Sequence, residues 1–354
     1  MGSAVAGPTT APTPAPAPAL VPTAAARPDR RARLARPDRR ARLVLLLLLL
    51  AALGVTALYL TLNARAGWDF VLPFRGRRVA AMVLVGISVS TSTVAFQTLA
   101  ANRILTPSIM GFDALYQAIQ TALVFFLGGL TVVRIGVLGH FWLALAVMLA
   151  ASLAIFWGLL GSGRRSLRLV LLVGVVIGTL LRALTLMLQR LLDPDAFHVL
   201  QGRLFASFSG VDERLLAVGA VVVTLGAGAL WALRRRLDVL ALGRDTAISL
   251  GLSHRRVTLA VITVVALLVS TSTALVGPIT FFGLLVAHLA YPAVRSHRHA
   301  LTLPAAALLS VVVLVGGQTV LEHLLGQATL LSVVIEFIGG IVFIALLVAQ
   351  GRRR

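Results

Sequence analysis

The sequence contains no cysteine and no lysine, so all 32 of its basic residues are arginines. The missing lysine excludes a Walker phosphate loop, because the lysine of that motif holds the β- and γ-phosphates of a nucleotide. The missing cysteine excludes disulfides, thiolate metal sites and covalent haem attachment. We therefore expect no nucleotide-hydrolysing site, no cofactor and no metal ligands in this chain.

Charge is also scarce, since charged residues make up 12% of the 354-residue chain and apolar residues 58%. Residues 43–62, 79–101 and 335–348 form long apolar runs. A helix of about 20 apolar residues spans a hydrocarbon core of roughly 30 Å. Because the runs are continuous and do not alternate, we expect an all-α integral membrane protein and not a β-barrel.

Proline, glycine and charge clusters divide residues 43–354 into about ten expected transmembrane helices. These are 43–63, 78–101, 112–131, 136–160, 168–191, 214–234, 256–277, 279–293, 301–321 and 331–349. Residues 195–209 predict a further half-length helix.

The first 42 residues are rich in Ala, Pro and Thr and then in Arg, with "ARPDRRARL" occurring twice in tandem. Such a segment cannot bury an apolar core, so we expect a disordered basic tail. Placing this tail and the C-terminus in the cytoplasm puts 23 of the 32 arginines on the inner side. That distribution follows the positive-inside rule and predicts a multi-pass protein of the bacterial cytoplasmic membrane. The net charge of +20 therefore reflects a lipid bilayer and not nucleic acid as the partner.

Four arginines depart from this rule: Arg65, Arg75, Arg77 and Arg78 fall in the outer connection between the first two helices. Arginines that snorkel to lipid headgroups would explain them. A basic platform for an acidic partner outside the cell would explain them equally well.

The pentapeptide "VSTST" occurs at 89–93 and again at 269–273. With ten helices the two copies lie in helices of opposite direction, which predicts two inverted five-helix halves. We hypothesise that their hydroxyls line a translocation path together with Gln97, although packing between helices is the simpler explanation. The residues of this hypothesis are Ser90, Thr91, Ser92, Thr93, Ser270, Thr271, Ser272 and Thr273.

Polar groups within the predicted spans are few, and each is a functional candidate because burying charge in a bilayer is costly. The set comprises Arg182, Glu322, Glu336, Gln97, Gln189 and Gln318. This number is too small for a proton relay. His297 and His299 stand beside Arg295 and Arg298 on a short inner loop, which indicates a positive-inside cluster and not a metal site.

The inner loop 234–256 interleaves leucines with charges, and Gly243 and Gly251 lie where short helices would begin or end. We expect two short helices at the membrane surface. They could be an inert turn, or the surface on which a cytoplasmic motor pushes.

At this loop the chain resembles the iron-chelate (siderophore) and cobalamin permease family of ABC importers. The family pattern LG-[DE]-x-TA-x-x-LG is matched by Leu242, Gly243, Asp245, Thr246, Ala247, Leu250 and Gly251. Residues 274–290 resemble the family stretch AGPIxFVGLxxPHxxR, with Ala287 in place of the usual proline. Residues 96–121, "LFASFSGV" and "VGGQ" are similar to the subgroup that serves catecholate-type siderophores.

The resemblance implies the permease subunit of a type II ABC importer that moves a ferric siderophore already chelated. A cytoplasmic ATPase dimer would press on the loop 242–251, and a second, identical or homologous permease would complete the path. An extracytoplasmic siderophore-binding protein would dock on Arg77 and Arg78. Asn102 and Ile104 match the cytoplasmic gate of the family.

Two other classes remain open. A secondary transporter coupled to an ion gradient needs no such loop and should carry paired carboxylates buried within its helices, which the sequence does not indicate. A non-transporting scaffold or receptor would have no substrate-dependent effect on an ATPase.

Overall fold

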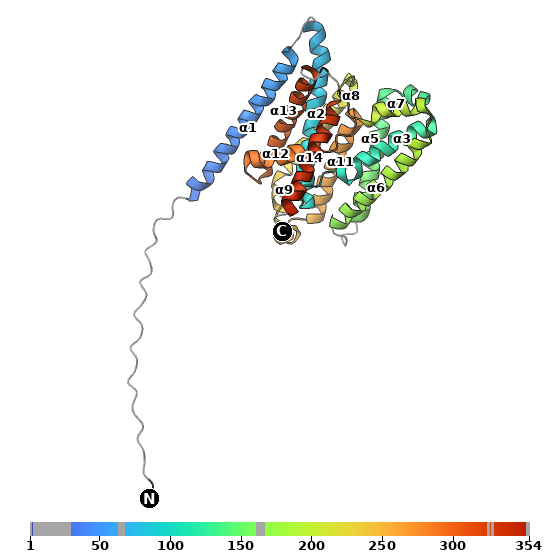
Figure 1. The fold of residues 1–354 in the computed structure, drawn as a ribbon. Helices are drawn as coiled ribbons and strands as arrows, with labels where there is room; N and C mark the ends of the chain where they lie inside the picture. The colour runs from blue at the N-terminus through green and yellow to red at the C-terminus, as the bar shows by residue number, and fades with distance from the viewer. Residues whose placement is uncertain are drawn as a thin grey trace.

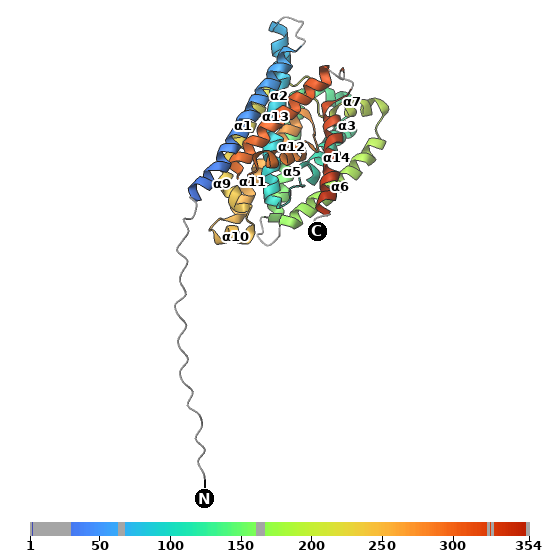
Figure 2. The same ribbon diagram turned by 60° about the vertical axis from the view of Figure 1, so that its left-hand side comes forward.

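The computed structural model describes residue 2, residues 30–62, 68–160 and 167–323, residue 326 and residues 329–351, and all regular elements in these ranges are helices. The helices form one bundle with two ends (Figure 1). We name these the α10 end, where α14 also finishes, and the α7 end, where α1 turns back into α2 (Figures 1 and 2).

All ten predicted spans have a counterpart. Eight helices among the described residues are long and apolar enough to cross a membrane, and two shorter apolar helices accompany them. The ten are α1 (Arg30–Thr61), α2 (Trp68–Ala100), α3 (Asp113–Leu127), α5 (Gly136–Leu160), α6 (Leu167–Arg190), α8 (Glu213–Ala232), α11 (His254–Val276), α12 (Phe282–Val294), α13 (His299–His323) and α14 (Leu331–Gly351).

The connections contain five short elements: η1 (Ser108–Phe112), α4 (Gly129–Arg134), α7 (Pro194–Leu204), α9 (Arg234–Leu240) and α10 (Arg244–Ser249). The helix α7 corresponds to the half-length helix predicted at 195–209, and α9 and α10 to the predicted pair of surface helices. The first helix begins at Arg30 and so reaches further toward the N-terminus than the predicted boundary at 43. Residues 3–29 of the predicted disordered tail lie outside the described residues.

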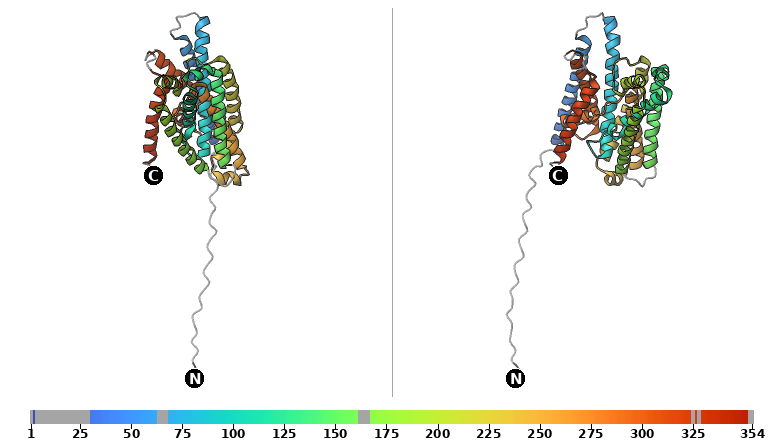
Figure 3. Two further views of the ribbon diagram at one scale, coloured as in Figure 1. Left: turned by 90° about the vertical axis from the view of Figure 1, so that its right-hand side faces the viewer. Right: turned by 45° about the vertical axis from the view of Figure 1, so that its right-hand side comes forward.

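The centre of the bundle is built around α2, which packs against α8, α11, α12 and α13. Beside this centre stands a group that contains α3, α5, α6 and α7, and α1 lies along the opposite flank (Figure 1). The helix α2 also extends past the other helices at the α7 end (Figure 3).

The two halves meet where α2 crosses α11. Ser88 Oγ donates a hydrogen bond of 2.7 Å to the carbonyl oxygen of Leu268, across a sequence separation of 180 residues. The two copies of VSTST are separated by the same number of residues. Ser88 and Leu268 therefore hold equivalent positions relative to the two copies, and the two inverted five-helix halves stay a prediction.

Small residues allow the helices around this contact between α2 and α11 to approach closely. A methyl group added at Gly283 of α12 would overlap Thr93 Oγ1 of α2 and would lie 3.1 Å from Thr93 Cβ. One at Gly86 would lie 2.7 Å from Ser310 Oγ of α13. The hydroxyl-rich stretch of α2 is therefore closely packed, with Gly283 of α12 against Thr93 and Gly86 of α2 itself against Ser310 of α13.

We predict that Gly283→Ala destabilises the protein by about 1–3 kcal/mol, because the packed core must move to admit the methyl group. The added truncation Thr93→Ala should restore much of the loss by removing the overlapping atoms. Thermal unfolding in detergent measures both effects. Gly228→Ala on α8 is the matched control, since its methyl group meets no atom within 4 Å. Equal melting temperatures for Gly283→Ala and Gly228→Ala would contradict the prediction.

Candidate coupling surface and gate

The predicted coupling loop folds into two short helices that project at the α10 end (Figure 2). Gly243, with φ of 98°, separates α9 from α10, and Gly251, with φ of 79°, separates α10 from the approach to α11. Both angles lie in the left-handed region that side chains with a Cβ disfavour. The two glycines of the sequence pattern thus set the directions of the helices.

Apolar side chains of this loop divide into an anchoring set and an exposed set. Leu237, Leu240 and Ala247 are buried against the bundle. Leu242 is 59% exposed and Leu250 is 61% exposed, although both lie at the end of the bundle and outside its spans. The remaining predicted residues Asp245, Thr246, Gly243 and Gly251 are also exposed. Ile248 is half exposed between them, and the sequence pattern did not single it out.

The predicted gate is a tight turn after α2. Ala101 has φ of 47°, and Asn102 Oδ1 then accepts a hydrogen bond of 2.9 Å from the Ile104 backbone N–H. This is the local bond by which asparagine stabilises turns. Gln97 Nε2 donates to the Arg103 carbonyl oxygen. The asparagine thus shapes the turn, and Ile104 is buried beneath it.

A cavity of about 830 Å³ separates this gate turn from the coupling helices. Its lining comes from the end of α2, from α9 and from the turn between α12 and α13. The lining residues that concern the gate are Gln97, Asn102, Asp238, Leu242, Tyr291 and His299. The structure therefore brings residues of two predicted sites, the coupling loop and the gate, into the lining of one cavity.

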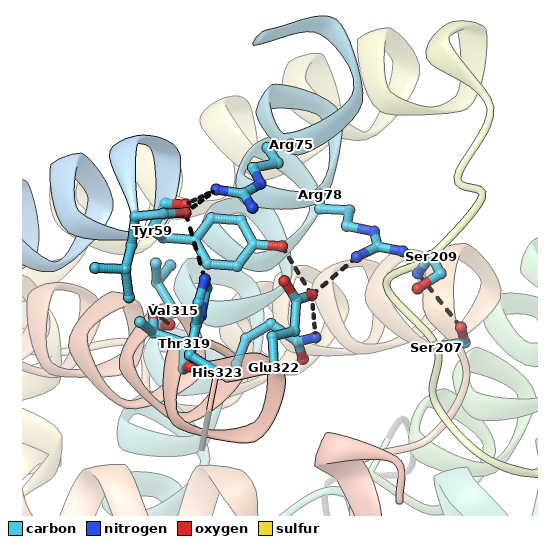
Figure 4. Close-up of polar contacts among 11 residues, drawn as sticks. Tyr59, Arg75, Arg78, Ser207, Ser209, Val315, Thr319, Glu322 and His323 are labelled. Carbon is cyan, nitrogen blue, oxygen red and sulfur yellow. Dashed lines mark hydrogen bonds and ion pairs between the residues drawn. The ribbon is translucent and has the colours of Figure 1, made fainter. Parts of the chain in front are cut away.

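At the α7 end, one carboxylate oxygen holds three helices together (Figure 4). Glu322 Oε1 of α13 accepts hydrogen bonds from Arg78 Nη1 of α2 at 2.8 Å, Tyr59 Oη of α1 at 3.0 Å and Gln318 Nε2 at 2.7 Å. Arg75 Nη1 donates to the carbonyl oxygens of Tyr59 and Leu62 at the end of α1. Hydrogen bonds in which one partner is charged are the strong ones. Two of the four exceptional arginines thus hold α2 in place: Arg75 binds the end of α1, and Arg78 binds Glu322 of α13.

Arg77 and Arg78 differ in their surroundings. Arg77 is exposed, and its Nε donates to the carbonyl oxygen of Pro73 in its own helix. Arg78 is half-buried and paired with Glu322. Both line a hollow of about 910 Å³ that also receives Asp212, Glu213 and Arg214 from the start of α8. The sequence analysis missed these three residues, because each stood there as an ordinary loop charge.

The paired hydroxyls of the predicted path are all buried inside the chain. Thr91 and Thr271 donate to the carbonyl oxygens of Ile87 and Leu267 at 2.6 and 2.7 Å, and Ser92 donates to that of Val89 at 3.0 Å. Such bonds to the preceding turn satisfy a hydroxyl inside a helix bundle. These contacts support packing, and a role in the path remains a hypothesis. Gln97 differs, since it lines the cavity at the gate.

One buried carboxylate was not anticipated. Asp113, the first residue of α3, is 4% exposed, and neither of its carboxylate oxygens has a hydrogen-bond partner in the described part of the chain. Its electrostatic neighbours include Thr280, which donates to Glu336 Oε1 at 3.2 Å. Glu336 of α14 also acts electrostatically on Asp113, although Glu336 is only partly buried. The sequence analysis did not single out Asp113, because it stands at a helix boundary. The absence of a pair of carboxylates buried within the helices stays a prediction.

Comparison with known proteins places this geometry in a family. The family model described as the FecCD transport family matches residues 42–349. The chain belongs to the FecCD transport family. Among the described residues of this FecCD member, no group of three or more His, Asp or Glu side chains is arranged to hold a metal ion.

Curated relatives of this FecCD chain cover most of its length. It is 40% identical to the petrobactin import system permease protein YclO of Bacillus subtilis over 86% of this chain and 97% of YclO. It is 35% identical to the petrobactin permease FatC of Bacillus anthracis over 86% of this chain and 88% of FatC. A solved metal-chelate type ABC transporter in an inward-facing conformation has a TM-score of 0.76 at 22% identity, covering 87% of this chain and 99% of that one. The last match shows the fold.

We predict that Glu322→Gln lowers stability by on the order of 3 kcal/mol, because Arg78 then lacks its counter-charge in a largely buried place. Arg78→Met combined with Glu322→Leu should recover most of this loss, since apolar side chains replace the whole pair. Denaturant unfolding of the purified protein measures the change. Arg77→Met is the control on the same helix, with an expected change within about 0.5 kcal/mol. A Glu322→Gln protein as stable as the wild type would contradict this account of the α7 end.

Proposed function

We propose that this chain is the permease subunit of an ABC importer that passes a ferric siderophore across the bacterial cytoplasmic membrane. Membership of the FecCD family supports a transport role, and the two petrobactin permeases named above support the substrate class. The iron enters already chelated, so the protein needs no metal ligands of its own. The chain makes and breaks no covalent bond.

The observation that carries this proposal is the exposed apolar surface of α9 and α10. Leu242, Ile248 and Leu250 stand out at the α10 end on helices whose other apolar residues are anchored in the bundle. Burying one such side chain stabilises a contact by about 1.5–3 kcal/mol. A separate ATPase dimer that covers these side chains would dock firmly, and it would supply the nucleotide site that a lysine-free chain cannot form with a Walker loop.

This assignment makes the α10 end cytoplasmic, with both termini on that side. The α7 end then faces the extracytoplasmic space and presents the hollow with Arg77, Arg78 and Arg214. We propose that acidic residues of a siderophore-binding protein dock there, with Arg77 as the more accessible of the two predicted arginines. A second permease, identical or homologous, would complete the path.

Coupling to an ion gradient is a second candidate, and Asp113 favours keeping it. A buried carboxylate without a hydrogen-bond partner inside a membrane bundle is costly, and such groups often serve proton or ion movement. The exposed Leu242 and Leu250, which flank α10, favour the ATP-driven importer, because a secondary transporter has no use for them.

We predict that Leu242→Asp combined with Leu250→Asp abolishes binding of the proposed partner ATPase subunit. Both side chains are exposed, so the variant should fold, and the loss follows from charge placed in an apolar contact. Co-purification from membranes measures it. Ser249→Asp adds one negative charge at an exposed position of α10 without removing an apolar side chain, and it should retain the ATPase. Equal recovery of ATPase with all variants would refute the assigned docking surface.

We predict that the complex of this chain with its ATPase and binding protein takes up ferric petrobactin into proteoliposomes when ATP is supplied without an ion gradient. Asp113→Asn should retain this uptake within about twofold, because the amide replaces the carboxylate without burying a charge. A proton gradient alone should drive none. Uptake on a proton gradient without ATP, lost in Asp113→Asn, would establish the ion-coupled alternative.

A further inference from the structure

The coupling helix α9 is bonded directly to the first residue of α13. Asp238 Oδ1 accepts a hydrogen bond of 2.8 Å from the His299 backbone N–H and one of 2.6 Å from His299 Nδ1. His299 is 3% exposed. The aspartate therefore caps the N-terminus of α13 from another helix and fixes the orientation of the imidazole ring at the same time.

The other ring nitrogen of His299 contacts α2. Its Nε2 lies 2.7 Å from Thr98 Oγ1 in the last turn of α2, and that hydroxyl also lies 2.9 Å from the Val94 carbonyl oxygen. Because Nδ1–H donates to Asp238, a neutral ring accepts the hydroxyl hydrogen at Nε2. A protonated ring donates from Nε2, and the hydroxyl then donates to Val94. The bridge between α9 and α2 persists in both cases.

The bridge ends immediately before the gate. Thr98 precedes Ala101 and Asn102, where the backbone leaves the helix and the gate turn begins. The residue after Asn102 connects the turn to α12 and to the turn that leads into α13. The guanidinium of Arg103 lies 4.7 Å from the centre of the Tyr291 ring of α12, and its Nη2 lies 3.2 Å from His297 Nδ1. The gate is thus fastened on two sides to the turn that carries His299.

From this geometry we propose that His299 is a positioning residue that transmits movement of α9 and α10 to the gate. The proposal rests on the proposed function, in which the ATPase moves the exposed side of these helices. Asp238 and the buried Leu237 both belong to the short helix α9, so a displacement of this helix displaces Asp238 with it. The cavity of about 830 Å³ beside the bridge leaves the gate turn room to be displaced.

A purely structural histidine and a transmitting one predict different results. If His299 only fills space, its loss lowers the amount of folded protein, and the remaining molecules transport normally. If it transmits force, the folded complex still hydrolyses ATP but moves less substrate for each ATP. The deciding quantity is the ratio of ferric petrobactin transported to ATP hydrolysed.

The experiment uses the full complex of permease, ATPase and binding protein in proteoliposomes, with ferric petrobactin carrying radioactive iron. We expect His299→Ala to lower the transport-to-hydrolysis ratio about fivefold or more, the size of a typical coupling between sites. His299→Asn can replace only the Nδ1 bond to Asp238, and His299→Gln only the Nε2 bond to Thr98. Since each keeps one side of the bridge, both should be uncoupled as strongly as His299→Ala.

The control is His140→Ala. His140 of α5 is also buried, and its Nε2 lies 2.6 Å from the Val132 carbonyl oxygen, remote from the gate. Its loss should lower thermal stability and leave the ratio unchanged. Asp238→Ala and Thr98→Val remove the two side chains that the ring connects. Each should lower the ratio in the wild type and leave it without further change in His299→Ala, where the ring is already missing.

An unchanged ratio in His299→Ala, with wild-type uptake intact, would overturn this proposal and leave the proposed function standing. So would additive effects of Asp238→Ala and Thr98→Val in the His299→Ala background. Absence of ATP-driven uptake by the wild-type complex would overturn both.

Discussion

The requirement that every backbone N–H and C=O be satisfied without water determines this structure. In a lipid environment only helices and closed barrels meet it, and continuous apolar runs leave helices. The same requirement extends to side chains. Thr91 and Thr271 each return their hydroxyl hydrogen to the preceding turn, whereas the buried Ser270 Oγ in the same stretch has no hydrogen-bond partner in the described part of the chain.

The groups that are open to partners lie at the two ends, while polar groups such as Asp113 and Ser270 are buried in the bundle without a hydrogen-bond partner among the described residues. At the α7 end, Glu322 gathers donors from three helices around one oxygen, beside a hollow with exposed basic groups. At the α10 end, exposed leucines stand on helices that are anchored from behind. A membrane protein that binds partners on both sides of a bilayer needs exposed binding groups at both ends of its bundle.

The close approach of helices at Gly86 and Gly283 makes the core resistant to small adjustments. Close-packed interiors do not deform continuously, so movement passes between ends as displacement of whole helices. The bonds from Asp238 to His299 and from His299 to Thr98 have this character, since they join the ends of three helices and not flexible loops.

The sequence by itself determined the ten spans and the short helices at 234–256, because long apolar runs and the glycines and charges that interrupt them act locally along the chain. It could not show that Asp113 and Glu336 share neighbours, that Glu322 neutralises Arg78, or that the VSTST hydroxyls are enclosed. It also treated His299 as one charge in a basic loop. Those facts depend on which helices meet, and contacts between residues some 60 to 260 positions apart leave no periodic trace in one sequence. Only the tertiary structure, which sets helix against helix, decided them.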